Sequence, residues 1–172
     1  MANDPRTLVV DDPFTGETAC TIALADSAEV NSTLERGRDV ARAWRLTPIA
    51  DRIAVCDRAM AAMEANAQSI ASDITRMMGK PIAQSMAEVK TCAARGRHAL
   101  SIAESALADV VLPPVSGFER RVVREPLGVV LDLPAWNYPL LTAVNCVVPA
   151  VLAGNAVVVK HSPRTPLCGD HF

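Results

Sequence analysis

The sequence has few aromatic residues, no excess of basic residues and no closely spaced cysteines. Aromatic residues make up 3% of the 172 positions, so a core must consist mainly of Ala, Val, Leu, Ile and Met. The net charge of -2 provides no basic surface for nucleic acid. Hydrophobic residues reach 50% and charged residues 21%, which excludes a disordered chain. This length fits one domain, or one and a half, with enough residues to bury a core.

The cysteines show neither a disulfide framework nor a metal site. They are five, spread evenly, without a C-x-x-C motif or a close Cys/His cluster: Cys20, Cys56, Cys92, Cys146 and Cys168. We therefore expect reduced thiols in a cytoplasmic protein, and no metal. Residues 1–17 contain no apolar run long enough for a signal peptide.

One apolar stretch, residues 140–159, is about as long as a transmembrane helix. Pro149 and the pair Gly154-Asn155 would break a lipid-exposed helix, and charged residues flank the stretch on one side only. We favour a buried helix, a turn and a buried strand over a membrane span.

The N-terminal part predicts a hairpin followed by helices. Residues 9–25 have the character of short strands, joined by a turn at residues 12–16. A helix is predicted from Ser27, with Asp26 or Ser27 as its N-cap, and another from Thr47-Pro48. The first helix carries an apolar face at steps of three and four: Val30, Leu34, Gly37, Ala41 and Trp44.

Two longer apolar stripes predict a pair of long helices. One runs from Ile49 to Met77 and stops at Gly79-Lys80-Pro81, and the other runs from Ile82 to Val110 and stops at Pro113-Pro114. The connection is so short that the helices must fold back on each other. The alternatives are a coiled coil that binds a partner, or a helical interaction module that folds from residues 27–112 alone. Glu88 and Lys90 are typical of a solvated helical face, and His98 and His171 have no evident partners.

The C-terminal part predicts a strand-helix-strand unit. Residues 120–125 are typical of an exposed strand, 128–133 and 156–160 of buried strands, and 139–152 of a helix between them. Such a crossover implies a parallel sheet and an α/β fold. A further helix is predicted to start at Thr165-Pro166. A two-stranded parallel sheet needs neighbours, so we expect an incomplete domain.

Chemistry in an open α/β sheet belongs beyond the carboxyl ends of the strands. Two segments take that place here, residues 134–139 and 160–165. The first offers the Asn137 amide, which is able to stabilise a developing oxyanion, and the second offers the Lys160 cation, which suits a ribose or a phosphate. Taken singly, either residue also fits a turn or a solvated strand end.

The two segments are part of a longer pattern of motifs: Glu125 to Val130, Trp136 to Leu140, Pro149 to Lys160 and Thr165 to Leu167. In order and spacing over about fifty residues, these motifs resemble the NAD(P)-dependent aldehyde dehydrogenase superfamily. Nearer the N-terminus, the similar features are Asp12 to Glu17, Trp44, Arg52, and Gly79-Lys80-Pro81 followed by Glu88. The resemblance thus covers nearly the whole chain.

The resemblance implies a fold and site roles. It implies a helical N-terminal segment and an incomplete Rossmann-like sheet, divided at residues 1–112 and 113–172. Asn137 would be the oxyanion-hole donor to a thiohemiacetal, and Trp136 would line the nicotinamide site. Lys160 would bind the adenosine ribose. The implied residues that bind NAD or NADP are Leu133, Pro134, Ala135, Trp136, Lys160, Ser162 and Pro163.

Two departures from the family pattern matter. Ala135 stands where the family usually has Pro, which predicts a slightly different loop. Pro163 stands where the family often has a Glu that repels the 2′-phosphate of NADP, and His161 and Arg164 add expected positive charge. We therefore predict that NADP is tolerated.

The resemblance also implies what lies elsewhere. The family's nucleophilic cysteine, general-base glutamate and second glycine-bearing motif belong after Phe172, and none of the five cysteines matches the nucleophile. We expect the 172-residue chain alone to be inactive, and the complete enzyme to be a homo-oligomer that oxidises an aldehyde to a carboxylic acid, without nucleic-acid or membrane partners. The alternative is a non-catalytic remnant that binds a nucleotide weakly or pairs with another subunit.

Overall fold

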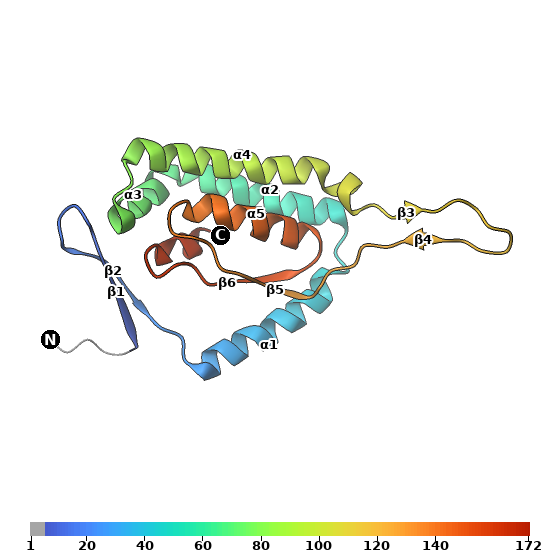
Figure 1. Cartoon of the computed structure of the whole chain (residues 1–172), viewed down its shortest axis with the longest axis horizontal. Helices are drawn as coiled ribbons and strands as arrows, with labels where there is room; N and C mark the ends of the chain where they lie inside the picture. The colour runs from blue at the N-terminus through green and yellow to red at the C-terminus, as the bar shows by residue number, and fades with distance from the viewer. Residues whose placement is uncertain (1–5) are drawn as a thin grey trace.

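The computed structural model describes residues 6–172; residues 1–5, the start of the predicted 1–112 segment, lie outside the described residues. A two-stranded parallel sheet lies at the centre, with helices on both faces (Figure 1). β5 (Val129–Asp132) pairs with β6 (Ala156–Val159), and α5 (Pro139–Leu152) crosses between them. α1 (Ser27–Trp44) covers the other face. The predicted α/β class and strand-helix-strand unit are confirmed.

Helix α1 starts and packs as its sequence predicts. Asp26 is the N-cap and forms a capping box with Glu29, in which each side chain accepts a hydrogen bond from the other residue's backbone N–H, at 2.9 and 2.8 Å. Gly37 faces the sheet, where an added Cβ would lie 3.4 Å from a Val129 methyl group. The small residue thus brings α1 close to β5.

The second helix is two helices rather than one. α2 (Ile49–Ala65) and α3 (Ala67–Met78) meet at Asn66, whose backbone leaves helical geometry and whose side-chain amide donates to the Ala62 carbonyl at 2.8 Å. The unbroken helix predicted up to Met77 is therefore wrong, because an Asn side chain competes for backbone hydrogen bonds. Pro48, not Thr47, is the N-cap residue of α2.

The antiparallel helix pair is confirmed. Gly79 ends α3 with a left-handed backbone, and α4 (Ile82–Leu107) then runs back along α3 and α2 (Figure 1). Gly96 lets α2 and α4 approach, since an added Cβ would lie only 2.2 Å from the Met60 sulfur. The stripes are buried within the chain, in a core that includes Met60, Ile70, Ile74, Met77, Val89, Cys92, Leu140 and Val144.

Helix α4 ends earlier than predicted, and an exposed arm follows. Ala108 adopts an extended backbone, so Val110 lies in a strand and Pro113 does not end the helix. β3 (Val110–Val111) and β4 (Arg121–Val122) pair antiparallel in an arm that projects from the body (Figure 1). Residues 108–125 are all exposed, which confirms an exposed strand near Arg121.

The two ends of the chain flank the helical layer. β1 (Thr7–Asp11) and β2 (Thr18–Ala23) form the predicted hairpin. The last element is a 3-10 helix, η1 (Pro166–His171), which has Thr165 as its N-cap residue and begins where the sequence predicts a helix. Strand β5 is only partly covered, with Leu131 60% exposed, because the sheet has no further strand beside it in the described chain.

Among residues 6–172, every helix is too short or too polar to cross a membrane.

Candidate functional site

The two predicted site segments lie at the same edge of the sheet. β5 and β6 run parallel in register from Val129–Ala156 to Asp132–Val159, so both strands end together. The Lys160 N–H continues the ladder and donates to the Asp132 carbonyl at 3.0 Å. The segments after Asp132 and Val159 therefore begin side by side, as the strand-helix-strand topology predicts.

The first segment presents its polar and aromatic groups to solvent. Pro134 is buried, while Trp136 is 52% exposed and the Asn137 side chain is also exposed. Within residues 6–172 the Asn137 side-chain amide makes no hydrogen bond, so both of its N–H donors are free for a ligand. Leu133 and Ala135 are exposed too. This is the exposure that an oxyanion donor beside a cofactor surface needs.

The backbone of the same segment is held from beneath by a buried ion pair. Lys80 donates to the Asn137 carbonyl at 2.7 Å and to the Glu88 carboxylate. Glu88 also accepts from the backbone N–H groups of Leu140 and Leu141, at 3.0 and 3.3 Å. The Lys80 ammonium lies 4.0 Å from the centre of the Tyr138 ring. Every residue from 137 to 141 in this turn is thus reached by the pair, except Pro139, which has no N–H to offer.

The prediction that Glu88 lies on a solvated face is wrong. Glu88 is 2% exposed. The buried face of α4 includes Ser85, Glu88 and Cys92 in addition to residues of the predicted stripe such as Val89 and Ala93. Ser85 lies three positions before Glu88 and Cys92 lies four positions after it, so both share its helix face. These small residues are the signal in the sequence that Glu88 is buried. Lys90 is exposed, as predicted.

The second segment carries the predicted cofactor residues Lys160, Ser162 and Pro163. Lys160 and Pro163 are exposed and Ser162 is partly buried. The Ser162 hydroxyl accepts from the Arg164 N–H at 3.3 Å, and the Ser162 carbonyl accepts from the Thr165 N–H at 3.0 Å. These bonds fix a tight turn that leaves the Lys160 ammonium in solvent.

The positive charge predicted around Pro163 is largely absent. Burial lowers the pKa of His161, which keeps its ring neutral near pH 7, and its Nε2 lies 3.4 Å from the Pro139 carbonyl. Arg164 forms an ion pair with Asp11 at 2.5 Å. The expectation for His161 is therefore wrong, and Arg164 is compensated by an acidic partner. The lack of a carboxylate at Pro163 remains.

The remaining polar groups near the site do not form a nucleophile. Burial raises the pKa of all five thiols, that of Cys92 to about 12. The Cys146 thiol and the Asp132 carboxyl group interact electrostatically, and burial raises the pKa of both groups. Because the thiolate is the reactive form, none of these cysteines is activated. All five are free thiols, and no cluster that could hold a metal ion occurs in residues 6–172.

Several residues of the quoted motifs anchor the crossover helix and its following strand. Trp44 donates from its indole to the Val151 carbonyl at 2.9 Å, and Arg52 donates to the Leu152 carbonyl at 2.6 Å. The Asn155 side chain accepts from the Gly128 N–H and donates to the Ala150 carbonyl, both at 3.0 Å. These bonds satisfy carbonyls at the end of α5 and tie the start of β5 to β6.

Two histidines without predicted partners differ in the structure. His171 lies 3.1 Å from the Asp73 carboxylate, so it does have a partner. His98 is exposed.

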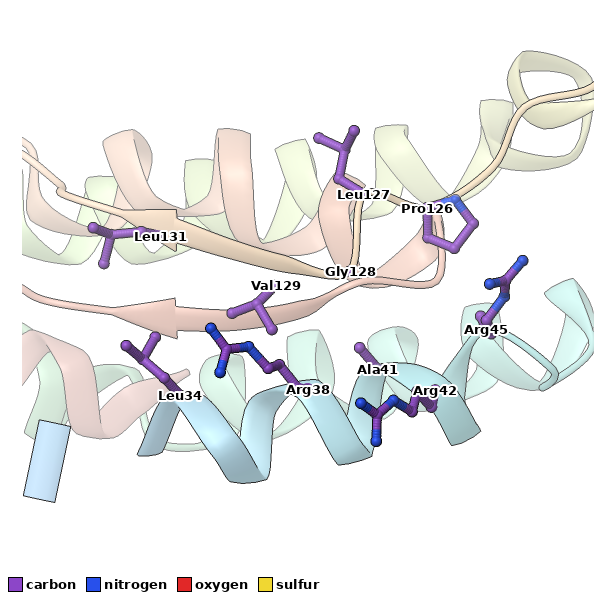
Figure 2. Close-up of a pocket in the computed structure, with 10 residues that line it drawn as sticks. All are labelled: Leu34, Arg38, Ala41, Arg42, Arg45, Pro126, Leu127, Gly128, Val129 and Leu131. Atoms are coloured by element: carbon purple, nitrogen blue, oxygen red, sulfur yellow. The ribbon is translucent and has the colours of Figure 1, made fainter. Parts of the chain in front are cut away.

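A groove on another side of the molecule is separate from these segments. It has a volume of about 520 Å³ and lies between α1 and the free edge of β5 (Figure 2). Three arginines line it, Arg38 and Arg42 of α1 and Arg45 at the C-cap of that helix, together with apolar residues of 126–131. Arg42 and Arg45 already pair with Asp39 and Glu125. None of the predicted site residues contributes to this groove.

Comparisons with known proteins agree with the motifs and the geometry. The model of the "Aldehyde dehydrogenase family" matches residues 1–172. N-succinylglutamate 5-semialdehyde dehydrogenase 1 of Caulobacter vibrioides is 34% identical over 164 residues, which are 95% of this chain and 34% of that protein. Succinate-semialdehyde dehydrogenase [NADP(+)] of Deinococcus radiodurans is 34% identical over 165 residues, 96% of this chain and 34% of that protein.

Solved structures show the same fold. A crystal structure of succinate-semialdehyde dehydrogenase from Burkholderia pseudomallei is 30% identical, with a TM-score of 0.90 over 96% of this chain and 34% of that one. An aldehyde dehydrogenase from Brucella melitensis biovar abortus matches with a TM-score of 0.92 at 25% identity, over 99% of this chain and 35% of that one. The chain spans about a third of the length of the curated relatives it matches. On the family model, the relatives and the shared fold, this chain belongs to the aldehyde dehydrogenase family.

Proposed function

We propose that this chain is the N-terminal part of an NAD(P)-dependent aldehyde dehydrogenase that oxidises an aldehyde to a carboxylic acid. The observation that carries the proposal is the exposed, unpaired Asn137 amide on one strand end, beside the exposed Lys160 on the neighbouring parallel strand end. Residues 1–112 and 113–172 would then form a helical segment and the first strands of one cofactor-binding domain.

The residues at the sheet edge fit a dinucleotide. The segment 133–136 offers an exposed indole and backbone, and Lys160 and Ser162 offer an ammonium and a hydroxyl for ribose. When bound, the nicotinamide accepts a hydride. The part of this chain in the reaction is to hold the cofactor and to donate an Asn137 N–H to the oxygen that gains negative charge when a thiolate attacks the aldehyde.

The test uses the protein that carries this segment, purified from its native source. Its intact mass is measured first, and it is then assayed with succinate semialdehyde and either cofactor, because the two curated relatives act on semialdehydes. We expect a mass about three times 18.3 kDa, since the match covers 34% of those relatives. We also expect Asn137→Ala to lower kcat by roughly 10²–10³-fold, the cost of an oxyanion donor. Unchanged kcat in that variant would refute the role of Asn137.

A second candidate is a chain that binds nucleotide without turnover. The raised pKa of all five thiols favours it, because this chain by itself offers no activated nucleophile. An intact mass of 18.3 kDa for the native protein, with NAD binding but no dehydrogenase activity, would support this candidate against the first.

We further propose that NADP is accepted as well as NAD. The support is the uncharged Pro163 beside Ser162, which places no negative charge near a 2′-phosphate. His161 and Arg164 add little to this support, because His161 is neutral and Arg164 is paired with Asp11. Pro163→Glu places a carboxylate near the ribose and is expected to weaken NADP binding by about tenfold or more, with a smaller effect on NAD. Dissociation constants measured for both cofactors by fluorescence titration decide this. Equal effects on NAD and NADP would contradict it.

A further inference from the structure

Within residues 6–172 the Asn137 side-chain amide makes no hydrogen bond, yet the backbone of the same residue is held by a charged group. The Lys80 ammonium, 7% exposed, donates to the Asn137 carbonyl at 2.7 Å. This carbonyl belongs to the same residue whose free amide faces solvent. A positive charge therefore holds the main chain of Asn137 from the buried side while the side chain stays available on the other side.

The following helix is fixed by the other member of the ion pair. α5 begins at Pro139 with no side-chain N-cap of its own, since Tyr138 offers none. The Glu88 carboxylate accepts from the N–H groups of Leu140 and Leu141 and so replaces the missing cap from another helix. A carboxylate is also favoured there by the helix dipole.

The pair is shielded from water and satisfied on both sides. The side chains of Lys80 and Glu88 are 6% and 0% exposed, and the Lys80 ammonium also lies against the Tyr138 ring. Charge-assisted hydrogen bonds in such an environment are short and strongly directional. The carbonyl of Asn137 and the start of α5 consequently have one preferred position relative to α4.

We propose that Lys80 and Glu88 are positioning residues that act through Asn137, by holding its backbone so that the side-chain amide points to the oxyanion. The kinetic part of this inference rests on the proposed function, whereas its structural part does not. Neither residue touches substrate or cofactor, because both are buried beneath the turn.

The structural part is tested on the 172-residue chain by NMR. Lys80→Met is compared with Lys80→Arg, and Glu64→Gln on an exposed ion pair is the matched control. We expect Lys80→Met to shift the Asn137 side-chain amide resonances and to speed hydrogen exchange of the Leu140 and Leu141 amides by about tenfold or more. Lys80→Arg should restore most of the protection, and Glu64→Gln should change neither.

If Lys80→Met does not fold, the double variant Lys80→Met/Glu88→Gln replaces it. This variant buries no unpaired charge, and the Gln carbonyl still accepts from the Leu140 and Leu141 N–H groups. The contacts of the ammonium with the Asn137 carbonyl and the Tyr138 ring are then lost, so the Asn137 resonances should shift while the Leu140 and Leu141 amides remain protected. Unchanged Asn137 resonances in the folded variant would overturn the inference.

The kinetic part is tested in the complete native protein with a double-mutant cycle. Lys80→Met should lower kcat by about tenfold or more while the KM for the cofactor changes little, and Lys80→Arg should recover most of the loss. In an Asn137→Ala background, Lys80→Met should lower kcat no further. Independent, multiplicative losses would overturn action through Asn137. If Asn137→Ala alone has no effect, the proposed function fails, and the NMR result still decides whether the pair holds the turn.

Discussion

Among the ion pairs that involve helix α4, the Lys80–Glu88 pair and the Arg97–Glu64 pair differ in burial and in the groups that they bind. Lys80–Glu88 is buried, and its members bind three backbone groups of a neighbouring turn and helix. Arg97–Glu64 lies at the surface with side chains 40% and 41% exposed, and its two 2.6 Å contacts tie α4 to α2. The surface pair has good bidentate geometry, yet water replaces either partner easily. The comparison teaches that position, rather than geometry, decides what an ion pair controls.

The largest effect is expected from breaking the buried pair on one side. Lys80→Met leaves the Glu88 carboxylate buried and without its cation, which costs about 3–5 kcal/mol. Urea unfolding of the chain, followed by circular dichroism, measures the loss. The double variant Lys80→Met/Glu88→Gln should recover part of it, and equal stability of the single and double variants would contradict an uncompensated charge as the cause.

A smaller effect is expected from a buried polar group without charge. Asn155→Ala removes the acceptor of the Gly128 N–H and the donor to the Ala150 carbonyl. The Ala150 carbonyl keeps the backbone N–H of residue 155 at 3.0 Å, whereas the Gly128 N–H is left without a partner, which costs about 1–3 kcal/mol. The same urea titration tests this, with Asn145→Ala on the exposed side of α5 as the control. A loss no larger than that of the control would show that water satisfies the Gly128 N–H.

A pH-dependent effect of more modest size is expected from His161. Burial lowers the pKa of His161 in the folded chain below its ordinary 6.5, although Asp132 and Asp170 act in the other direction and His171 adds to the lowering. The unfolded chain therefore binds a proton below pH 6.5 that the folded chain does not, and the free energy of unfolding falls as the pH decreases through this range.

Replacing that ring removes this part of the pH dependence. The slope of stability against pH just below 6.5 should be shallower in His161→Asn than in the parent chain. Asp11 and Glu64 affect stability only at lower pH. Their ordinary pKa values are 3.8 and 4.5, and hydrogen bonds from Arg164 and Arg97 lower the pKa of each carboxyl group further. Thermal unfolding at a series of pH values separates the two ranges, and parallel curves for both proteins would argue against His161.

The smallest effect is expected at the surface pair. Glu64→Gln removes the carboxylate from an exposed Arg97, which retains Asp57 at 3.4 Å. The melting temperature should change by no more than about 3 °C, and less at 0.5 M salt, where exposed charges are screened. A decrease in melting temperature as large as that of Lys80→Met would contradict the expectation that the buried pair stabilises the chain more than the exposed pair does.

The sequence alone predicts the parts of this fold that depend on local chemistry. The hairpin turn at residues 12–16, the N-cap Asp26, the stop at Gly79 and the helix start at Pro139 each follow from one or two residues with strong backbone preferences. The exposure of Asn137 and Lys160 follows from the strand-helix-strand order.

The features that sequence reasoning missed depend on competition or on distant contacts. Asn66 competes with the helix for hydrogen bonds, and the outcome is not encoded in the apolar stripe that continues on both sides. Helix α4 ends at Leu107, where the chain enters the exposed arm of residues 108–125, whose strands pair only with each other across the arm. Glu88 is charged and therefore suggests solvent, until Lys80 and the start of α5 supply its partners.

The support beneath the Asn137 turn also has a consequence for the order of folding. Lys80 and Asn137 are 57 residues apart in sequence, and Glu88 and Leu140 are 52 apart. Pro134 and Pro139 flank the turn and restrict its local conformations. The contacts of Lys80 and Glu88 with the turn form only when α4 has docked on α5. Because contacts this distant carry a loop-closure cost, the turn that presents Asn137 acquires its final shape only after α4 and α5 have come together.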